Sequence, residues 1–167
     1  MSNYIIGIDP DVERNGYAFI DMDTRKVKVE TVSMPHLIEL ITILQATANA
    51  AGKKLTVYVE AGWLNQSNWH LDWRDNKMKA AAIGKSQGRN EQRGRDICEL
   101  LTYRGITVVQ VPPLKKIWKG KDRKITHDEL TAIVGKIEHT NQEGRDAALL
   151  AWVNAGLPII MKGGHHA

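Results

Sequence analysis

The order of strand and helix signals is the feature that most constrains how this chain can fold. Three short apolar and β-branched runs come first, at 4–9, 16–21 and 26–32, and the turns between them are short enough for an antiparallel meander. Each later strand candidate follows a helix candidate, and strands joined through a helix usually run parallel. The order predicts an α/β fold with a five-stranded mixed sheet, three strands antiparallel and then two parallel, with helices on both faces.

The helices and the later strands have recognisable boundaries. The first helix is expected to open at Pro35 and to stop at Gly52, and the next strand ends at Glu60. An irregular stretch, 61–76, precedes a long helix. The remaining elements are that helix from about Lys77 to Arg104, a strand at 106–111, a helix opened by a capping box at Thr126 and a last helix from about Asn141. No repeat or linker divides them, so residues 1–167 are expected to form a single domain.

Composition limits the class of protein. A chain of 167 residues with 43% hydrophobic residues can bury one sizeable core, which argues against disorder. Cys98 is the only cysteine, which excludes an internal disulfide or a cysteine-based zinc cluster and fits a reducing compartment. No stretch approaches the roughly 20 apolar residues that cross a bilayer. We expect a soluble, cytoplasmic protein without a membrane partner.

Four carboxylates stand at places where they could meet. Asp9 ends the first strand and Glu60 ends the fourth, so parallel neighbouring strands would put them at one edge of the sheet, about 4.8 Å apart. Glu143 and Asp146 are three apart near the start of the last helix and share a face. Four acids without thiolates favour Mg²⁺ or Mn²⁺, and two such ions about 3.5 to 4 Å apart suit phosphodiester hydrolysis. We expect Asp9 to bridge two ions, Glu60 and Asp146 to hold one each, and Glu143 to be an outer ligand or to orient water.

Each acid also has a structural interpretation. Asp9 before Pro10 could simply begin a turn, although Glu60 as its partner favours a metal site. Glu143 could complete a T-x-x-E capping box with Thr140, and for this residue both interpretations stay open. Asp146 is followed by an apolar run and would be costly to bury without a partner, which favours a ligand.

A basic segment is the main candidate for nucleic-acid binding. The net charge of +4 is modest, but between positions 115 and 124 six basic residues stand against one acid, with Trp118 among them. Such a mixture is typical of nucleic-acid-binding surfaces, although a flexible, solvated loop would have a similar composition. The six residues are Lys115, Lys116, Lys119, Lys121, Arg123 and Lys124.

A helical stripe and a tryptophan-rich stretch are weaker candidates. Lys85, Arg89 and Arg93 recur every four residues, which usually marks a solvated helix face but could line a phosphate track. Trp63, like Trp69 and Trp73, could pack under a loop or stack on bases.

Taken together, the motifs resemble those of RuvC-type Holliday-junction resolvases over nearly the whole chain. The matching segments are Ile6-Gly7-Ile8-Asp9-Pro10 with Gly16-Tyr17, Val59-Glu60 and Asp146-Ala147-Ala148. The resemblance implies an RNase H-like fold, a homodimer and Mg²⁺-dependent nicking of four-way DNA junctions. It also implies that Trp63 works against junction bases and that Lys116 and Lys124 bind phosphate. The chain departs from the family pattern at Asp11, where the family usually has glycine, and at Glu143, where Asp or His is commoner.

The expected function is therefore a metal-dependent endonuclease that resolves four-way junctions by paired symmetric hydrolysis, as a homodimer acting in DNA recombination and repair. Two alternatives stay open. One is an RNase H-like nuclease acting on other branched DNA or on RNA/DNA hybrids. The other is a non-catalytic nucleic-acid-binding module in which the acids are structural.

Overall fold

The computed structural model describes residues 3–65 and 77–160. Its strands are β1 (Asn3–Asp9), β2 (Asn15–Asp21), β3 (Lys26–Val32), β4 (Lys54–Glu60) and β5 (Thr107–Val111). Its helices are α1 (Met34–Ala50), α2 (Lys77–Tyr103), α3 (His127–Val134) and α4 (Gln142–Asn154), with short 3₁₀ turns η1 (Gly62–Leu64) and η2 (Lys121–Arg123). Each strand and helix expected from the sequence is present close to its expected position. Trp69, Trp73 and the C-terminal tail lie outside the described residues.

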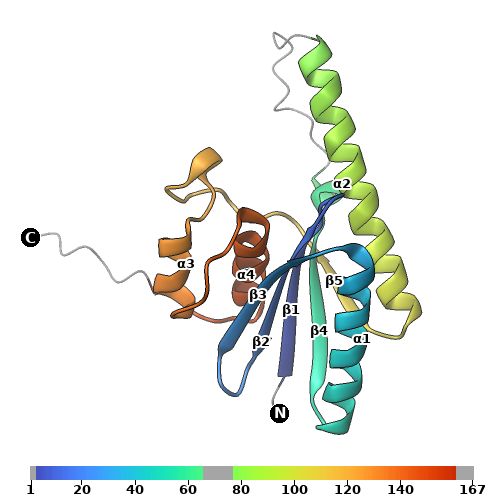
Figure 1. Cartoon of the computed structure of the whole chain (residues 1–167), viewed down its shortest axis with the longest axis vertical. Helices are drawn as coiled ribbons and strands as arrows, with labels where there is room; N and C mark the ends of the chain where they lie inside the picture. Colours follow the sequence, from blue (N-terminus) through green and yellow to red (C-terminus); the bar gives the residue numbers. More distant parts are fainter. Residues whose placement is uncertain (1–2, 66–76, 161–167) are drawn as a thin grey trace, which may run out of the picture.

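The five strands form one mixed sheet in the order β3-β2-β1-β4-β5. β1 pairs antiparallel with β2, and β2 pairs antiparallel with β3, which confirms the predicted meander. β4 pairs parallel with both β1 and β5. With helices on both faces of the sheet (Figure 1), this connectivity confirms the predicted five-stranded mixed sheet and agrees with the RNase H-like fold that the motif resemblance implies.

Each face of the sheet has its own hydrophobic core, because side chains of a strand alternate between faces. On β1, Ile6 and Ile8 pack in the core that α1 and α2 cover. Ile5 points the other way, into the core that α3 and α4 cover. Residues 7 and 9 continue this second direction, so the end of β1 aims Asp9 at the α4 face.

Two glycines let α4 lie directly on the sheet. A Cβ atom at Gly7 would collide with the carbonyl oxygen of Ala147, and one at Gly16 with the carbonyl oxygen of Glu143. Both strands therefore need a residue without a side chain where the helix crosses them. This close approach sets the start of α4 beside the carboxyl end of β1.

The helix α2 is packed along only part of its length. Ile97 and Leu101, in its C-terminal half, are fully buried against the sheet, whereas most side chains from Lys77 to Arg89 are exposed. In Figure 1 this N-terminal half projects beyond the sheet. The helix is continuous through its glycines, and Gly105, at a φ of 77°, follows its end as predicted. Among the described helices none is both long and apolar enough to cross a lipid bilayer.

The two C-terminal helices begin with different caps. Thr126 and Glu129 form the predicted capping box at the start of α3. At α4 the predicted alternative, a capping box of Thr140 with Glu143, is wrong. Asn141 caps this helix, because its Oδ1 accepts a hydrogen bond from the backbone nitrogen of Gly144 at 3.0 Å. Thr140 is buried, and its hydroxyl is instead hydrogen-bonded to His127 Nδ1 at 2.9 Å.

Candidate active site

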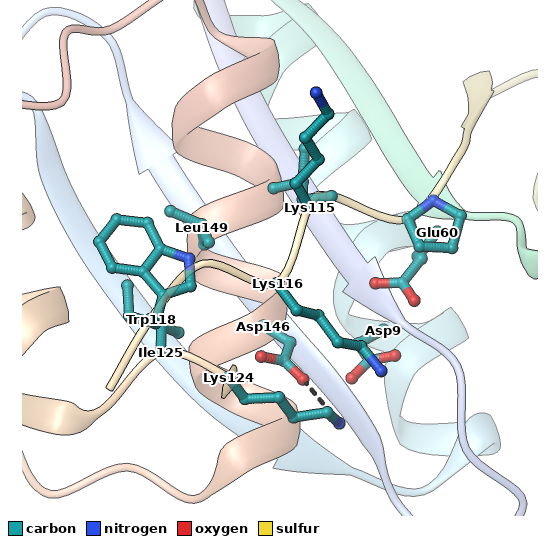
Figure 2. A pocket seen from close by; sticks show the side chains of 11 residues that line it. Asp9, Glu60, Lys115, Lys116, Trp118, Lys124, Ile125, Asp146 and Leu149 are labelled. Carbon is teal, nitrogen blue, oxygen red and sulfur yellow. Dashed lines mark ion pairs between the residues drawn. The ribbon is translucent and has the colours of Figure 1, made fainter. Parts of the chain in front are cut away.

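Three of the four predicted acids meet at one cavity. Asp9, Glu60 and Asp146 line a hollow of about 190 Å³ together with Lys116 and Lys124 (Figure 2). They come from the ends of two parallel strands and from the first turns of α4. The predicted proximity of Asp9 and Glu60 rests on β1 and β4 being parallel neighbours, and the sheet has this arrangement.

The strand geometry explains why Asp9 and Glu60 face the same side. Ile8 is aligned with Val59 across the parallel pair, so the two strands end one residue later at the same edge. Leu55, Val57 and Val59 of β4 pack toward α1 and α2, which leaves the alternate residues of that strand facing α4. Glu60 is one of those alternate residues and therefore points to the same face as Asp9.

The acids strongly influence one another's protonation. Burial raises the pKa of Asp9 well above its usual range, and the negative charges of Glu60 and Asp146 raise it further. Burial and Asp146 likewise raise the pKa of Glu60. Lys124 has the opposite effect on both carboxyl groups. A positive charge in this cavity therefore stabilises the ionised acids.

Asp146 is held at both of its carboxylate oxygens. Gln142 Nε2 donates to Oδ1 at 2.8 Å, and Lys124 Nζ lies 3.3 Å from Oδ2. Gln142 is itself fixed, because its Oε1 accepts from Arg145 at 3.0 Å and its Nε2 also donates to the Ile125 carbonyl oxygen at 3.2 Å. The sequence reasoning missed Gln142 and Arg145. The i, i+4 spacing of Gln142 and Asp146 is the signal that could have found the first of them.

On the expectation that Asp146 holds a metal ion, replacing Gln142 with Leu should lower metal affinity and any metal-dependent cleavage by about 10- to 100-fold, the usual cost of removing a group that orients a metal ligand. Calorimetric titration with Mn²⁺ and a cleavage assay measure the two effects. Gln45→Leu is the matched control, since Gln45 makes the same kind of i, i+4 bond to Asn49 on α1. Wild-type affinity and rate in Gln142→Leu would mean that Gln142 does not position Asp146.

Glu143 stands apart from the other three acids. It does not line the inner cavity but borders a wider groove of about 1090 Å³ that also reaches Asp9 and Glu60. Its charge is the last and smallest of the influences that raise the pKa of Asp9. Because Asn141 caps α4, the side chain of Glu143 is not needed for capping and stays available at the rim.

The predicted basic segment divides into inward and outward residues. Lys115, Lys116 and Lys124 line the cavity, and Figure 2 shows Lys116 extending in the direction of the acids while Lys115 extends away from them. The basic residues of the segment outside the cavity lining are all exposed: Lys119, Lys121 and Arg123. Trp118, predicted to lie with them on the binding surface, is instead buried in the core under α3 and α4, with 9% of its surface exposed.

The loop that carries these lysines is fixed to α3. Glu129 Oε1 accepts hydrogen bonds from the backbone nitrogens of Lys119, at 3.1 Å, and of Thr126, at 3.2 Å. Trp118 and the fully buried Ile125 fasten the loop on either side of the exposed turn. The basic segment, whose composition is also that of a flexible loop, therefore follows a defined path.

The predicted stripe on α2 is split by the fold. Lys85 and Arg89 are exposed on the projecting half of the helix. Arg93 is half-buried, and its guanidinium donates to the Val12 carbonyl oxygen at 3.1 Å and contacts Met34 Sδ at 2.9 Å. Arg93 therefore ties α2 to the turn between β1 and β2, and it does not form one continuous exposed stripe with the other two.

Trp63 packs against α2 and also borders the wide groove. Its ring lies 2.6 Å from the position that a Cβ at Gly94 would take, and its Nε1 donates to Gln110 Oε1 at 3.1 Å. The Arg95 guanidinium lies 5.1 Å from the ring centroid. These contacts hold the ring in place at the edge of the groove.

The donor set suits a hard divalent cation, because it consists of carboxylates that repel one another. Within residues 3–65 and 77–160, no group of three His, Cys, Asp or Glu side chains could hold a metal ion as the side chains stand. The Lys124 ammonium is the cation that Asp146 contacts in this arrangement.

Comparisons with known proteins give a limited result. No family model matches the chain, and no curated protein matches it. Among solved structures, the chain is similar to T. thermophilus RuvC in complex with a Holliday junction substrate, with a TM-score of 0.48 and 15% sequence identity over 92% of each chain.

Proposed function

We propose that this protein is a metal-dependent endonuclease that resolves four-way DNA junctions by paired symmetric phosphodiester hydrolysis. One observation carries the proposal: Asp9, Glu60 and Asp146 line a single cavity together with Lys116 and Lys124. Carboxylates suit a divalent cation, and lysines suit the phosphate that is cleaved. The choice of a four-way junction as substrate comes from the motif resemblance.

The proposed cofactor is Mg²⁺ or Mn²⁺, with two ions per active site. When bound, such ions activate water and stabilise the charge that develops on the phosphate. Asp9 would bridge the ions, while Glu60 and Asp146 would hold one each and Glu143 would act from the rim. Gln142 keeps the Asp146 carboxylate in one orientation, and Lys116 binds a non-bridging phosphate oxygen.

DNA binding is proposed to extend from the cavity along the wide groove. Trp63 and Lys116 border this groove, and so do Gln87 and Asn90 of α2. The projecting half of α2 adds exposed positive charge next to it. The remaining basic residues proposed to contact phosphates are Lys85, Arg89, Lys115, Lys119, Lys121, Arg123 and Lys124, and Arg93 would act through its anchoring of α2. Binding should weaken steeply as salt rises, because each phosphate contact releases counterions.

The proposed assembly is a homodimer, because resolving a two-fold symmetric junction needs two opposed nicks. We further propose that the chain forms one domain, since its helices pack on the two faces of a single sheet, and that it acts in the cytoplasm in DNA recombination and repair.

The deciding experiment compares cleavage of a labelled four-way junction, a linear duplex of the same sequence, a flap and an RNA/DNA hybrid in Mg²⁺ or Mn²⁺. Symmetric nicks in the junction alone are the expected result. Preferential cleavage of the flap or the hybrid would mean that the protein is a nuclease whose substrate is not the four-way junction. Tight binding without cleavage of any substrate would mean that the protein is a non-catalytic nucleic-acid-binding module.

A further inference from the structure

Lys124 forms an ion pair with the acid cluster. Its Nζ lies 3.3 Å from Asp146 Oδ2, and 36% of its side-chain surface is exposed. Burial alone would lower the pKa of Lys124, but the attraction of Asp146 and then of Asp9 and Glu60 raises it. One ammonium therefore interacts with all three carboxylates that line the cavity.

We propose that Lys124 is an internal counter-ion that holds the place of the divalent cation, so that a metal ion must displace its ammonium from Asp146. This inference rests on the proposed metal site and adds a competition within it. In the metal-free protein the ammonium of Lys124, in contact with Asp146, offsets part of the repulsion among the clustered acids. If the divalent cation and the Lys124 ammonium shared the cavity, the two cations would repel each other. This repulsion would drive the ammonium away from Asp146.

The local structure allows this exchange. The backbone at Lys124 is fixed, because its nitrogen donates to the Lys121 carbonyl oxygen at 3.1 Å and its carbonyl oxygen accepts from Gly120 at 2.9 Å. The four-carbon side chain can still turn, since more than a third of its surface meets solvent. Asp146 also keeps its orientation when the lysine leaves, because Gln142 holds the other oxygen at 2.8 Å.

The displaced ammonium would be free to bind an anion at the mouth of the cavity. When two ligands act through one group, each changes the binding free energy of the other by the same amount. A phosphate that takes Lys124 away from Asp146 therefore raises the affinity for the cation, and the cation raises the affinity for phosphate. Lys124 would in this way make metal binding in the free protein weaker than metal binding in the complex with substrate.

The test is calorimetric titration with Mn²⁺ alone, without DNA, at about pH 8, where protons compete least with carboxylates. Lys124→Met should bind Mn²⁺ about tenfold more tightly than wild type, within the range of typical coupling between two ligands. Lys124→Arg keeps the charge and should stay near the wild-type affinity. Lys121→Met is the matched control, because it removes the same charge from an exposed position on the same loop.

Thermal unfolding gives a second readout that needs no measurable heat of binding. In a chelator, Lys124→Met should melt at a lower temperature than wild type, because its acids lack their counter-ion, and Mn²⁺ should raise its melting temperature more than that of wild type. Equal or weaker Mn²⁺ affinity in Lys124→Met than in wild type would overturn the competition. No Mn²⁺ binding by any variant would instead remove the proposed metal site, and with it this inference.

Discussion

Asp146→Asn is expected to reduce metal-dependent cleavage by more than about a hundredfold. Replacing a residue that only orients a metal ligand already costs 10- to 100-fold, so replacing Asp146, which is proposed as a direct ligand, should cost more. Asn has nearly the shape of Asp, and the basic residues around the cavity are unchanged. Junction binding should therefore remain largely intact, and Asp9→Asn should behave in the same way.

The measurement is single-turnover cleavage of a labelled junction, with binding followed separately by a gel-shift assay. Asp128→Asn is the matched control, because this exposed acid lies on α3 outside the residues that line the cavity. Cleavage at the wild-type rate in Asp146→Asn would exclude this residue from the mechanism. A variant that neither binds nor cleaves would indicate a defect of folding, which circular dichroism detects.

Gly7→Ala is expected to lower the free energy of unfolding by about 2 to 3 kcal/mol, because the close contact of α4 with β1 leaves no room for a methyl group. The added methyl group would collide with the Ala147 carbonyl oxygen and would also come within 2.8 Å of the Ala151 Cβ. The helix backbone cannot yield as a flexible side chain would. Displacing α4 also moves Asp146 away from Asp9, so cleavage should fall together with stability.

Chemical denaturation measures this change, and Gly84→Ala provides a control of opposite sign. Apart from the neighbouring residues and backbone of α2 itself, no atom of the described residues lies within 4 Å of where a Cβ at Gly84 would stand, in an exposed part of this helix. The same methyl group should therefore stabilise the protein by about 0.5 to 1 kcal/mol. A Gly7→Ala variant as stable as wild type would contradict the close contact of α4 with β1.

Much of the fold could be predicted because its signals are local. Alternating apolar runs and turn residues located β1, β2 and β3. Gly105 marks the end of α2 through its positive φ, and Thr126 marks the start of α3 through its side-chain cap. The parallel arrangement of β1 and β4 followed from a general rule of chain connection. That arrangement was sufficient to predict that Asp9 and Glu60 would lie at one edge of the sheet.

The rest depends on contacts between distant segments. Thr140 and Asn141 are both good helix caps, and a hydrogen bond between Thr140 and His127 accompanies the capping of α4 by Asn141. The residues around Trp118 have the composition of a polar loop, but this side chain packs into the hydrophobic core under α3 and α4. Arg93 shares the periodicity of its exposed neighbours and is distinguished only by the turn that lies against it.

The unequal packing of α2 has a consequence for how the chain unfolds. Its C-terminal half opens only when the hydrophobic core opens, because Ile97 and Leu101 belong to that core. In the exposed half, most of the side chains that the structure describes are not buried against the core, and an isolated helical segment of that length is marginally stable in water. Lys85 and Arg89 therefore sit on a segment that can unwind and reform while the sheet and the acid cluster stay folded. A bound partner that held this segment helical would bear the entropic cost of ordering it, so part of the binding energy would go into local folding.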